Sequence, residues 1–140
     1  MKCLLIKPPF AQYIVQGVKP HEWRKRPTKI RGRIGIVECA PLKPIDKGTR
    51  EIIGDVELWY CSKRNEDGSY CWELRNAHRY KQPVTILFPH GAQTWINVDF
   101  TPPSELYPEL SQKERCRLEV ERIIRENEYL KKYLLKEGAK

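Results

Sequence analysis

Four residues near the amino terminus have types and spacing suited to binding a phosphate or a nucleotide. Gly17 is followed by Lys19, Glu22 and Arg24, at offsets of two, five and seven residues. If the segment from Lys19 is extended, alternate side chains share a face, so Glu22 and Arg24 would lie side by side. A carboxylate beside a guanidinium holds it in one pose and leaves its other donors for a phosphate or a base edge. The alternative is a salt-bridged loop that only stabilises the fold.

The positive charge of the chain is concentrated around these residues. The formal net charge is +8, and the fifteen residues from Lys19 to Arg33 hold seven Lys or Arg against Glu22 alone. A local basic patch is the usual footprint of a polyanionic partner, whereas a solvated charged loop is the alternative. We therefore assign phosphate contacts to five cations, with Glu22 orienting one of them or reading a base donor: Lys19, Arg24, Arg26, Lys29 and Arg31.

Aromatic and charged residues elsewhere in the sequence are candidates for the same binding site. Trp23 and Trp72 offer flat surfaces on which a base could stack. Glu73 follows Trp72 directly, and Arg79 lies in the segment after it, either at the rim of that binding site or in solvent. Histidines 21, 78 and 90 each stand alone in the sequence, so we expect surface or loop residues rather than ligands.

The cysteines indicate no metal or disulfide. The chain has five, an odd number, and none forms a CxxC pair. Cys61 and Cys71 could face each other across a hairpin, but neither has a His or Cys at ligand spacing. With no secretory signal and no apolar run of 18 residues, we expect reduced thiols in a cytoplasmic protein that does not enter a membrane. We expect no cofactor.

Short strands separated by turn signals must position these residues. We predict strands at residues 2–6, 33–40, 52–61, 70–74, 84–88 and 94–98, with Val56, Leu58 and Tyr60 on one side of the third. A two-turn helix should begin at Phe10 and end near Gly17. Residues 41–48 and 76–82 are predicted loops, 65–69 a turn, and Gly54 a bulge. This pattern is typical of a small barrel or sandwich.

The last forty residues have a different character. A stiff, proline-rich linker is predicted at 102–110, and Ser111 with Glu114 forms a capping box that opens a helix ending near Lys136. Positions 116, 120, 123, 127, 130 and 134 form a heptad seam that includes Asn127. Such a seam either packs on the barrel of its own chain or pairs with a second copy, where Asn fixes the register. Both alternatives stay open.

The sequence resembles a known family. Gly17, Lys19, Glu22 and Arg24 match the GxKxxExR pattern of the ASCH domain, a member of the PUA-like superfamily. Further stretches resemble the family in the same order: residues 5–11, 28–33, 54–58, 70–74 with Pro83, and 91–95, where the Trp comes one place early. The quoted likeness covers residues 2–100 and leaves out the tail from Ser104.

The resemblance implies a mainly β, or α+β, fold, namely a PUA-like small β-barrel with flanking short helices. The capping box and the heptad seam add a long C-terminal helix to it. Together these patterns divide the chain into a barrel domain at 1–101, a linker at 102–110 and a helix at 111–140. The resemblance also implies a cleft lined by the GxKxxExR segment that binds RNA or a nucleotide-like ligand. This binding function is our leading hypothesis.

Some members of the family are enzymes, which supplies an alternative. One branch removes an acyl group from a modified cytidine nucleoside, and another member behaves as a ribonuclease. The deacylating branch has Thr where this chain has Glu22, so we do not expect the same deacylation. If the chain is a hydrolase acting on RNA or a modified nucleoside, Lys19 with Glu22 or Glu73 would activate water.

Overall fold

The computed structural model describes residues 1–39, 49–87, 94–108 and 110–138. The predicted loop at 41–48 lies outside these residues, as do His90 and most of the predicted closing element at 91–95. The chain forms two compact units, Met1–Phe100 and Thr101–Lys140, and each is described by itself. The predicted three-part division of the chain stays a prediction.

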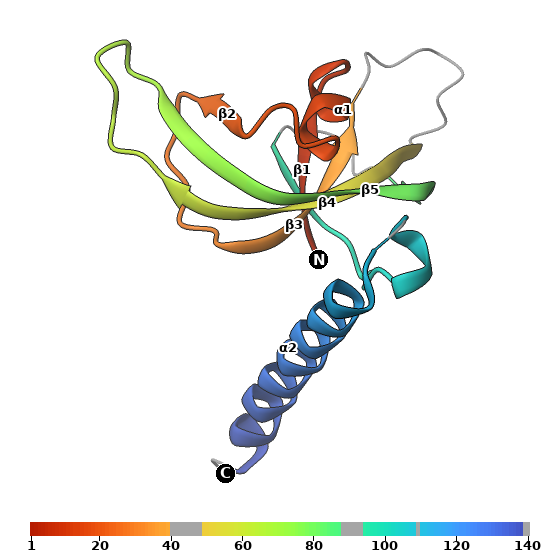
Figure 1. The fold of residues 1–140 in the computed structure, drawn as a ribbon. Coiled ribbons are helices and arrows are strands. Elements are labelled where there is room, and N and C mark those ends of the chain that lie inside the picture. Colours follow the sequence, from red (N-terminus) through yellow and green to blue (C-terminus); the bar gives the residue numbers. More distant parts are fainter. Residues whose placement is uncertain (40–48, 88–93, 109, 139–140) are drawn as a thin grey trace. The chain divides into compact units, whose positions relative to one another are not determined.

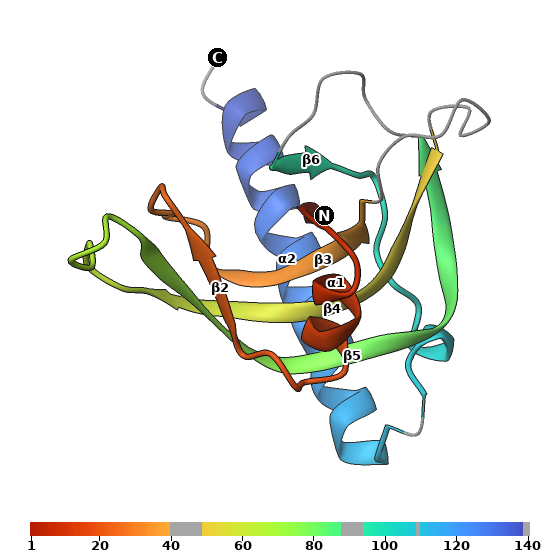
Figure 2. The same cartoon turned by 90° about the horizontal axis from the view of Figure 1, so that it is seen from above.

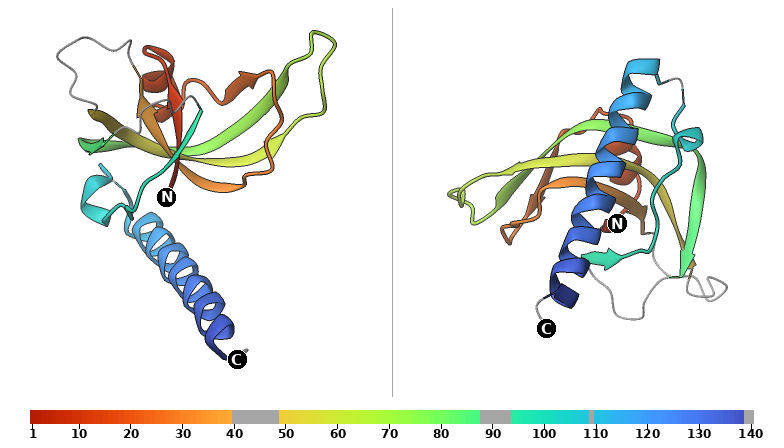
Figure 3. Two further views of the ribbon diagram at one scale, coloured as in Figure 1. Left: turned by 180° about the vertical axis from the view of Figure 1, so that it is seen from behind. Right: turned by 90° about the horizontal axis from the view of Figure 1, so that it is seen from below.

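The first unit is built on one curled, six-stranded sheet (Figures 1 and 2). The strands are β1 (Lys2–Ile6), β2 (His21–Arg24), β3 (Gly32–Glu38), β4 (Thr49–Cys61), β5 (Tyr70–Leu87) and β6 (Trp95–Asn97). Their order in the sheet is β2-β5-β4-β3-β1-β6, so β2 and β6 are the two edge strands (Figure 3). Only β1 and β3 pair in parallel among the described strands. The sheet curls into a half-barrel, which is consistent with the predicted PUA-like β fold.

A short helix, α1 (Phe10–Val15), covers the middle of the sheet against β3, β4 and β5 (Figure 2). Its Ala11, Ile14 and Val15 are buried among aliphatic side chains of the strands. Gly17 follows with φ of +78°, and the N–H of Val18 donates to the carbonyl of Tyr13 at 3.0 Å. Glycine suits this left-handed position after a helix. The predicted helix and its Gly17 cap are therefore confirmed, and the cap turns the chain toward Lys19.

The predicted loop at 76–82 is wrong, because β5 runs unbroken from Tyr70 to Leu87. The strand bends where its register against β4 shifts: Ile52 pairs with Val84, but Gly54 pairs with Arg79. Pro83 falls in the stretch between these pairs, where no ladder N–H is required of it. Asn76, with φ of +51°, adds a second irregularity. The residues that predict a break between two strands therefore lie where one continuous strand bends.

The bulges of β4 also change which side chains face inward. Gly54 lies at one of them, as predicted, and a Cβ there would come within 2.3 Å of the carbonyl oxygen of His78. Val56 and Leu58 are buried as expected, but Tyr60 is 46% exposed. The register against β5 shifts between Leu58 and Tyr60, which interrupts the alternation. The expectation that Tyr60 shares their side is therefore wrong.

A buried ion pair joins the middle strands of the sheet. Asp55 is fully buried; it accepts a hydrogen bond from Arg33 Nε at 2.6 Å and another from the Tyr80 hydroxyl at 2.7 Å. Arg33 also donates to the carbonyl of Asn76. Arg33 belongs to the basic segment from Lys19 to Arg33, but its guanidinium is buried and pairs with Asp55. The cations of that segment therefore do not all face solvent.

We predict that Asp55→Ala destabilises the fold by about 3–5 kcal/mol, because it leaves the Arg33 guanidinium buried without its counter-ion. Urea unfolding followed by circular dichroism measures the change. The matched control is Glu57→Ala, which removes the exposed pair between Glu57 and Arg75 on the same two strands and should cost far less. Equal losses in the two variants would contradict a central role for the buried pair.

Burial also sets the chemistry of Cys3 in β1. Its side chain is fully buried, and this desolvation raises the pKa of the thiol to about 11. Cys116, in the second unit, is exposed. Since the thiolate is the reactive form, the two cysteines should differ strongly in reactivity.

We expect iodoacetamide at pH 8 to label Cys116 readily and Cys3 only after denaturant unfolds the chain. Peptide mass spectrometry over time measures both rates in one sample. Labelling of Cys3 in the native protein at the rate of Cys116 would show that β1 is not buried as described.

The second unit contains η1 (Ser104–Leu106), a 3₁₀ helix, and α2 (Gln112–Gly138). The linker expected at 102–110 therefore includes one turn of helix. Ser111 caps α2, since its hydroxyl oxygen accepts a hydrogen bond from the N–H of Glu114 at 3.2 Å. The helix continues to Gly138, two residues beyond the predicted end. Of the predicted seam, the side chains of residues 116, 120, 123 and 127 are described and exposed, and both alternatives for the seam remain predictions.

Candidate functional site

The pairing of β2 with β5 sorts the motif residues onto two faces. Glu22 lies opposite Trp72, and His21 lies opposite Glu73. Because successive side chains of a strand point to opposite faces, Glu22 and Arg24 share the face of the buried Trp72. His21 and Trp23 share the other face with Glu73. The expectation that Glu22 and Arg24 share a face is confirmed.

Glu22 joins the two motif cations. Its side chain is largely buried; Lys19 Nζ lies 3.3 Å from Oε1, and Arg24 Nη2 lies 3.4 Å from Oε2. Lys19 Nζ also donates to the carbonyl of His21 at 2.5 Å. One buried carboxylate between two partly exposed cations leaves an excess of positive charge. The three side chains therefore meet, and their common contact is Glu22.

Contacts with β1 and α1 hold the same cations from the other side. Arg24 Nη2 donates to the carbonyl of Leu5 at 3.0 Å, and the guanidinium lies 5.9 Å from the centre of the Trp72 ring. Lys19 Nζ lies 5.9 Å from the centre of the Phe10 ring. Within the described part of the chain, the hydrogen bonds given for Arg24 use Nη2, and none is given for Nε or Nη1.

The two tryptophans take different places from those expected. Trp72 is only 2% exposed; its ring stacks on Trp95 with centroids 5.7 Å apart, and its Nε1 donates to the carbonyl of Arg26 at 3.0 Å. Trp72 is therefore a core residue, and the expectation that it stacks on a base is not supported. Trp23 is 55% exposed, but it lies on the face of β2 opposite Glu22. Trp95 and the Leu5 carbonyl were missed as neighbours of the site. Trp95 stood out only as part of the family-like stretch 91–95, and a backbone carbonyl carries no signal in the sequence.

The remaining candidate residues lie in several places. Arg26, Lys29 and Arg31 are exposed on the segment between β2 and β3, with Arg31 Nη1 donating to the carbonyls of Thr28 and Ile30. Arg79 is exposed on β5, opposite Gly54 in β4. Glu73 is half-buried on the face away from Glu22, so no ion pair with Lys19 is described for it. Of the two carboxylates considered for Lys19, the structure therefore brings Glu22 to it.

Arg75, which lies four residues before Arg79 on β5, forms a surface ion pair with Glu57 on β4. Its Nε and Nη2 each donate to the Glu57 carboxylate at 3.0 Å, and its guanidinium lies 5.0 Å from the Trp59 ring centre. The hydrogen bond from Arg75 lowers the pKa of Glu57 below its ordinary value. Arg75 is therefore held by Glu57 and Trp59 on the adjacent strand β4.

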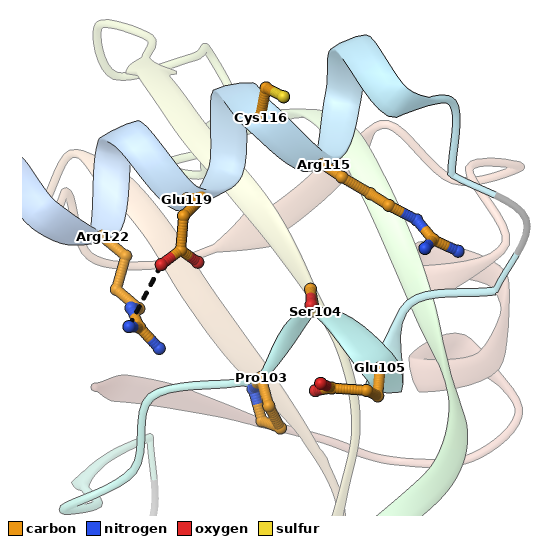
Figure 4. A pocket seen from close by; sticks show the side chains of 7 residues that line it. All are labelled: Pro103, Ser104, Glu105, Arg115, Cys116, Glu119 and Arg122. Atoms are coloured by element: carbon orange, nitrogen blue, oxygen red, sulfur yellow. Dashed lines mark ion pairs between the residues drawn. The ribbon is translucent and has the colours of Figure 1, made fainter.

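A separate pocket of about 460 Å³ lies within the second unit, between η1 and α2 (Figure 4). Its lining carries both signs of charge, and Glu119 pairs with Arg122 at 3.1 Å on its wall. No residue of the predicted site lines this pocket.

Among the described residues, no helix is long and apolar enough to cross a membrane.

The curled sheet, its covering helix and the Lys19–Glu22–Arg24 cluster define a mostly β protein with a cationic motif carried on an edge strand. The chain belongs to the ASCH domain family, whose model matches residues 4–138. The tail from Ser104, which the quoted resemblance left out, therefore lies inside the match.

The solved structures include a similar chain, a mutant ASCH protein from Zymomonas mobilis. It is 20% identical; the match covers 59% of this chain and 73% of that one, with a TM-score of 0.44. A search of curated proteins found no match.

Proposed function

We propose that this protein binds RNA or a nucleotide through Lys19, Arg24 and the exposed cations that follow them. The observation that carries the proposal is the position of Glu22, which holds both motif cations at 3.3 and 3.4 Å. A carboxylate that only neutralised one arginine would leave no charge for a ligand. Here one carboxylate orients two cations, and a phosphate would contact the donors that Glu22 leaves unused.

The neighbouring basic residues extend this surface along the chain. Lys25, Arg26, Lys29 and Arg31 are exposed within eight residues of β2. A ligand that runs along them would carry several phosphates, which favours a single strand over a mononucleotide. Membership of the ASCH family, which is generally linked to RNA binding, agrees with this choice. The proposal places the protein in the cytoplasm, where RNA is available to it.

We predict that affinity for a fluorescein-labelled single-stranded RNA falls steeply with salt, by about 0.7 log units per log unit of salt for each phosphate neutralised. Arg24→Ala should weaken binding and make this slope shallower by about 0.7. Fluorescence anisotropy across a salt series measures both quantities.

The matched control is Lys81→Ala, which removes one exposed positive charge on β5, nine residues beyond Trp72, and should leave binding unchanged. Arg24→Lys keeps the charge but loses the planar guanidinium, so partial weakening would show that its geometry matters. A salt-independent affinity would contradict the phosphate contacts. Unfolding of Arg24→Ala, seen as a lowered melting temperature, would instead assign Arg24 to the fold.

A hydrolase is the second candidate, favoured by the 3.3 Å contact between Lys19 and Glu22. In this alternative Glu22 takes a proton from water, and Lys19 stabilises the negative charge that develops on the substrate. The amide of an acylated nucleoside and the phosphodiester of RNA are both substrates that such a pair could attack. The binding proposal requires neither reaction.

Incubation with single-stranded RNA and with N-acylated nucleosides, followed by chromatography, separates the two candidates. We expect binding without turnover. Turnover that Lys19→Ala abolishes, while Lys81→Ala retains it, would favour the hydrolase. Turnover that persists in Lys19→Ala would assign it to other residues or to a contaminant.

A further inference from the structure

The outward face of the β2–β5 pair carries a second cluster, which the motif does not include. His21 on β2 and Cys71 and Glu73 on β5 lie there, with the potential ligand atoms of all three within 4.8 Å of one another. His21 Nδ1 and Cys71 Sγ are 3.4 Å apart. Cys71 is buried, whereas His21 and Glu73 are half-buried. The cluster is thus partly enclosed and open on one side.

Strand pairing explains why these residues meet although fifty positions separate the first two. His21 lies opposite Glu73, and Trp23 lies opposite Cys71. Directly opposite residues of an antiparallel pair point to one face, and diagonal neighbours remain within reach. Cys71 therefore has a nearby histidine, contrary to the expectation from sequence spacing that it has no ligand partner.

One nitrogen, one thiolate sulfur and one carboxylate oxygen form a donor set that suits zinc. Zinc binds these atoms at about 2.0–2.3 Å, and sites with three protein ligands keep a fourth position for water. Two ligand atoms around a tetrahedral ion lie roughly 3.5 Å apart at such bond lengths. The 3.4 Å between His21 Nδ1 and Cys71 Sγ matches this spacing. A carboxylate oxygen of Glu73 lies within 4.8 Å of both atoms and is the candidate third ligand.

A Cys–His nucleophile is the other chemistry that this pair could support, and the electrostatics oppose it. Burial raises the pKa of the Cys71 thiol, and the negative charge of Glu73 raises it further. A nucleophile needs the thiolate, which these surroundings disfavour. A divalent cation reverses this, because it lies between the sulfur and the carboxylate and stabilises both as anions. Lys19 is the positive charge that acts on Cys71, and its ammonium is already paired with Glu22.

We propose that His21, Cys71 and Glu73 form a zinc site with an open fourth position on the face of β2 opposite Glu22 and Arg24. The ion would link the edge strand β2 to β5. Because His21 and Glu22 are adjacent, zinc binding would also order the strand that carries the cationic motif. This inference does not depend on the proposed RNA binding.

The test uses the full chain, stripped of metal with a chelator and kept reduced, and titrated with Co²⁺ as a spectroscopic substitute for zinc. We expect a near-ultraviolet sulfur-to-cobalt charge-transfer band that saturates at one ion per chain and disappears when Zn²⁺ is added. Mg²⁺, which prefers oxygen ligands, should not remove the band. Zn²⁺ should also raise the melting temperature, since it binds the folded chain.

Variants assign the ligands. Cys71→Ser should abolish the charge-transfer band, and His21→Ala and Glu73→Gln should each weaken Zn²⁺ binding by at least about tenfold. Cys116→Ser is the matched control, because it removes an exposed cysteine in the second unit and should leave the band intact.

Absence of the band in the wild-type chain at saturating Co²⁺ would overturn the proposal, as would a band that persists in Cys71→Ser. His21→Ala changes a half-buried side chain, so it tests the site even if Cys71→Ser does not fold. Unchanged Zn²⁺ affinity in a folded His21→Ala would likewise overturn the proposal.

Discussion

The antiparallel pairing of the four-residue strand β2 with β5 is the constraint on which both clusters of this protein depend. It places Glu22 over the core, where a carboxylate is costly to bury unless cations compensate it. Lys19 and Arg24 provide that compensation, and Arg24 is held further by the carbonyl of Leu5 in β1. The cationic motif is therefore part of the packing of the half-barrel and not an appendage to it.

The same alternation gives the two faces of β2 different chemistry. Glu22 and Arg24 lie on the inner face with the buried Trp72, whereas His21 faces Cys71 and Glu73 on the outer side. Since β2 is an edge strand, its position depends on one neighbour, and contacts on either face help to hold it. Ligand binding on one face and metal binding on the other would therefore act on one short segment.

Much of the first unit could be predicted from residue patterns. The helix at Phe10, its Gly17 cap and the bulge at Gly54 follow from local chemistry that operates within a few residues. The loop predicted at 76–82 failed because Pro83 and Asn76, which end strands in isolation, are tolerated where β5 curves away from its β4 register. Such tolerance depends on the neighbouring strand, so no local pattern reports it.

The candidate site divides in the same way between sequence and tertiary structure. The sequence by itself determined that Glu22 and Arg24 share a face, because alternation along an extended strand is a local property. Only the tertiary structure decided that Arg33 forms an ion pair with Asp55, that the Trp72 ring stacks on Trp95, and that His21 contacts Cys71. Each of these contacts joins residues more than twenty positions apart, and strand pairing, which sets such distances, is fixed by the whole sheet.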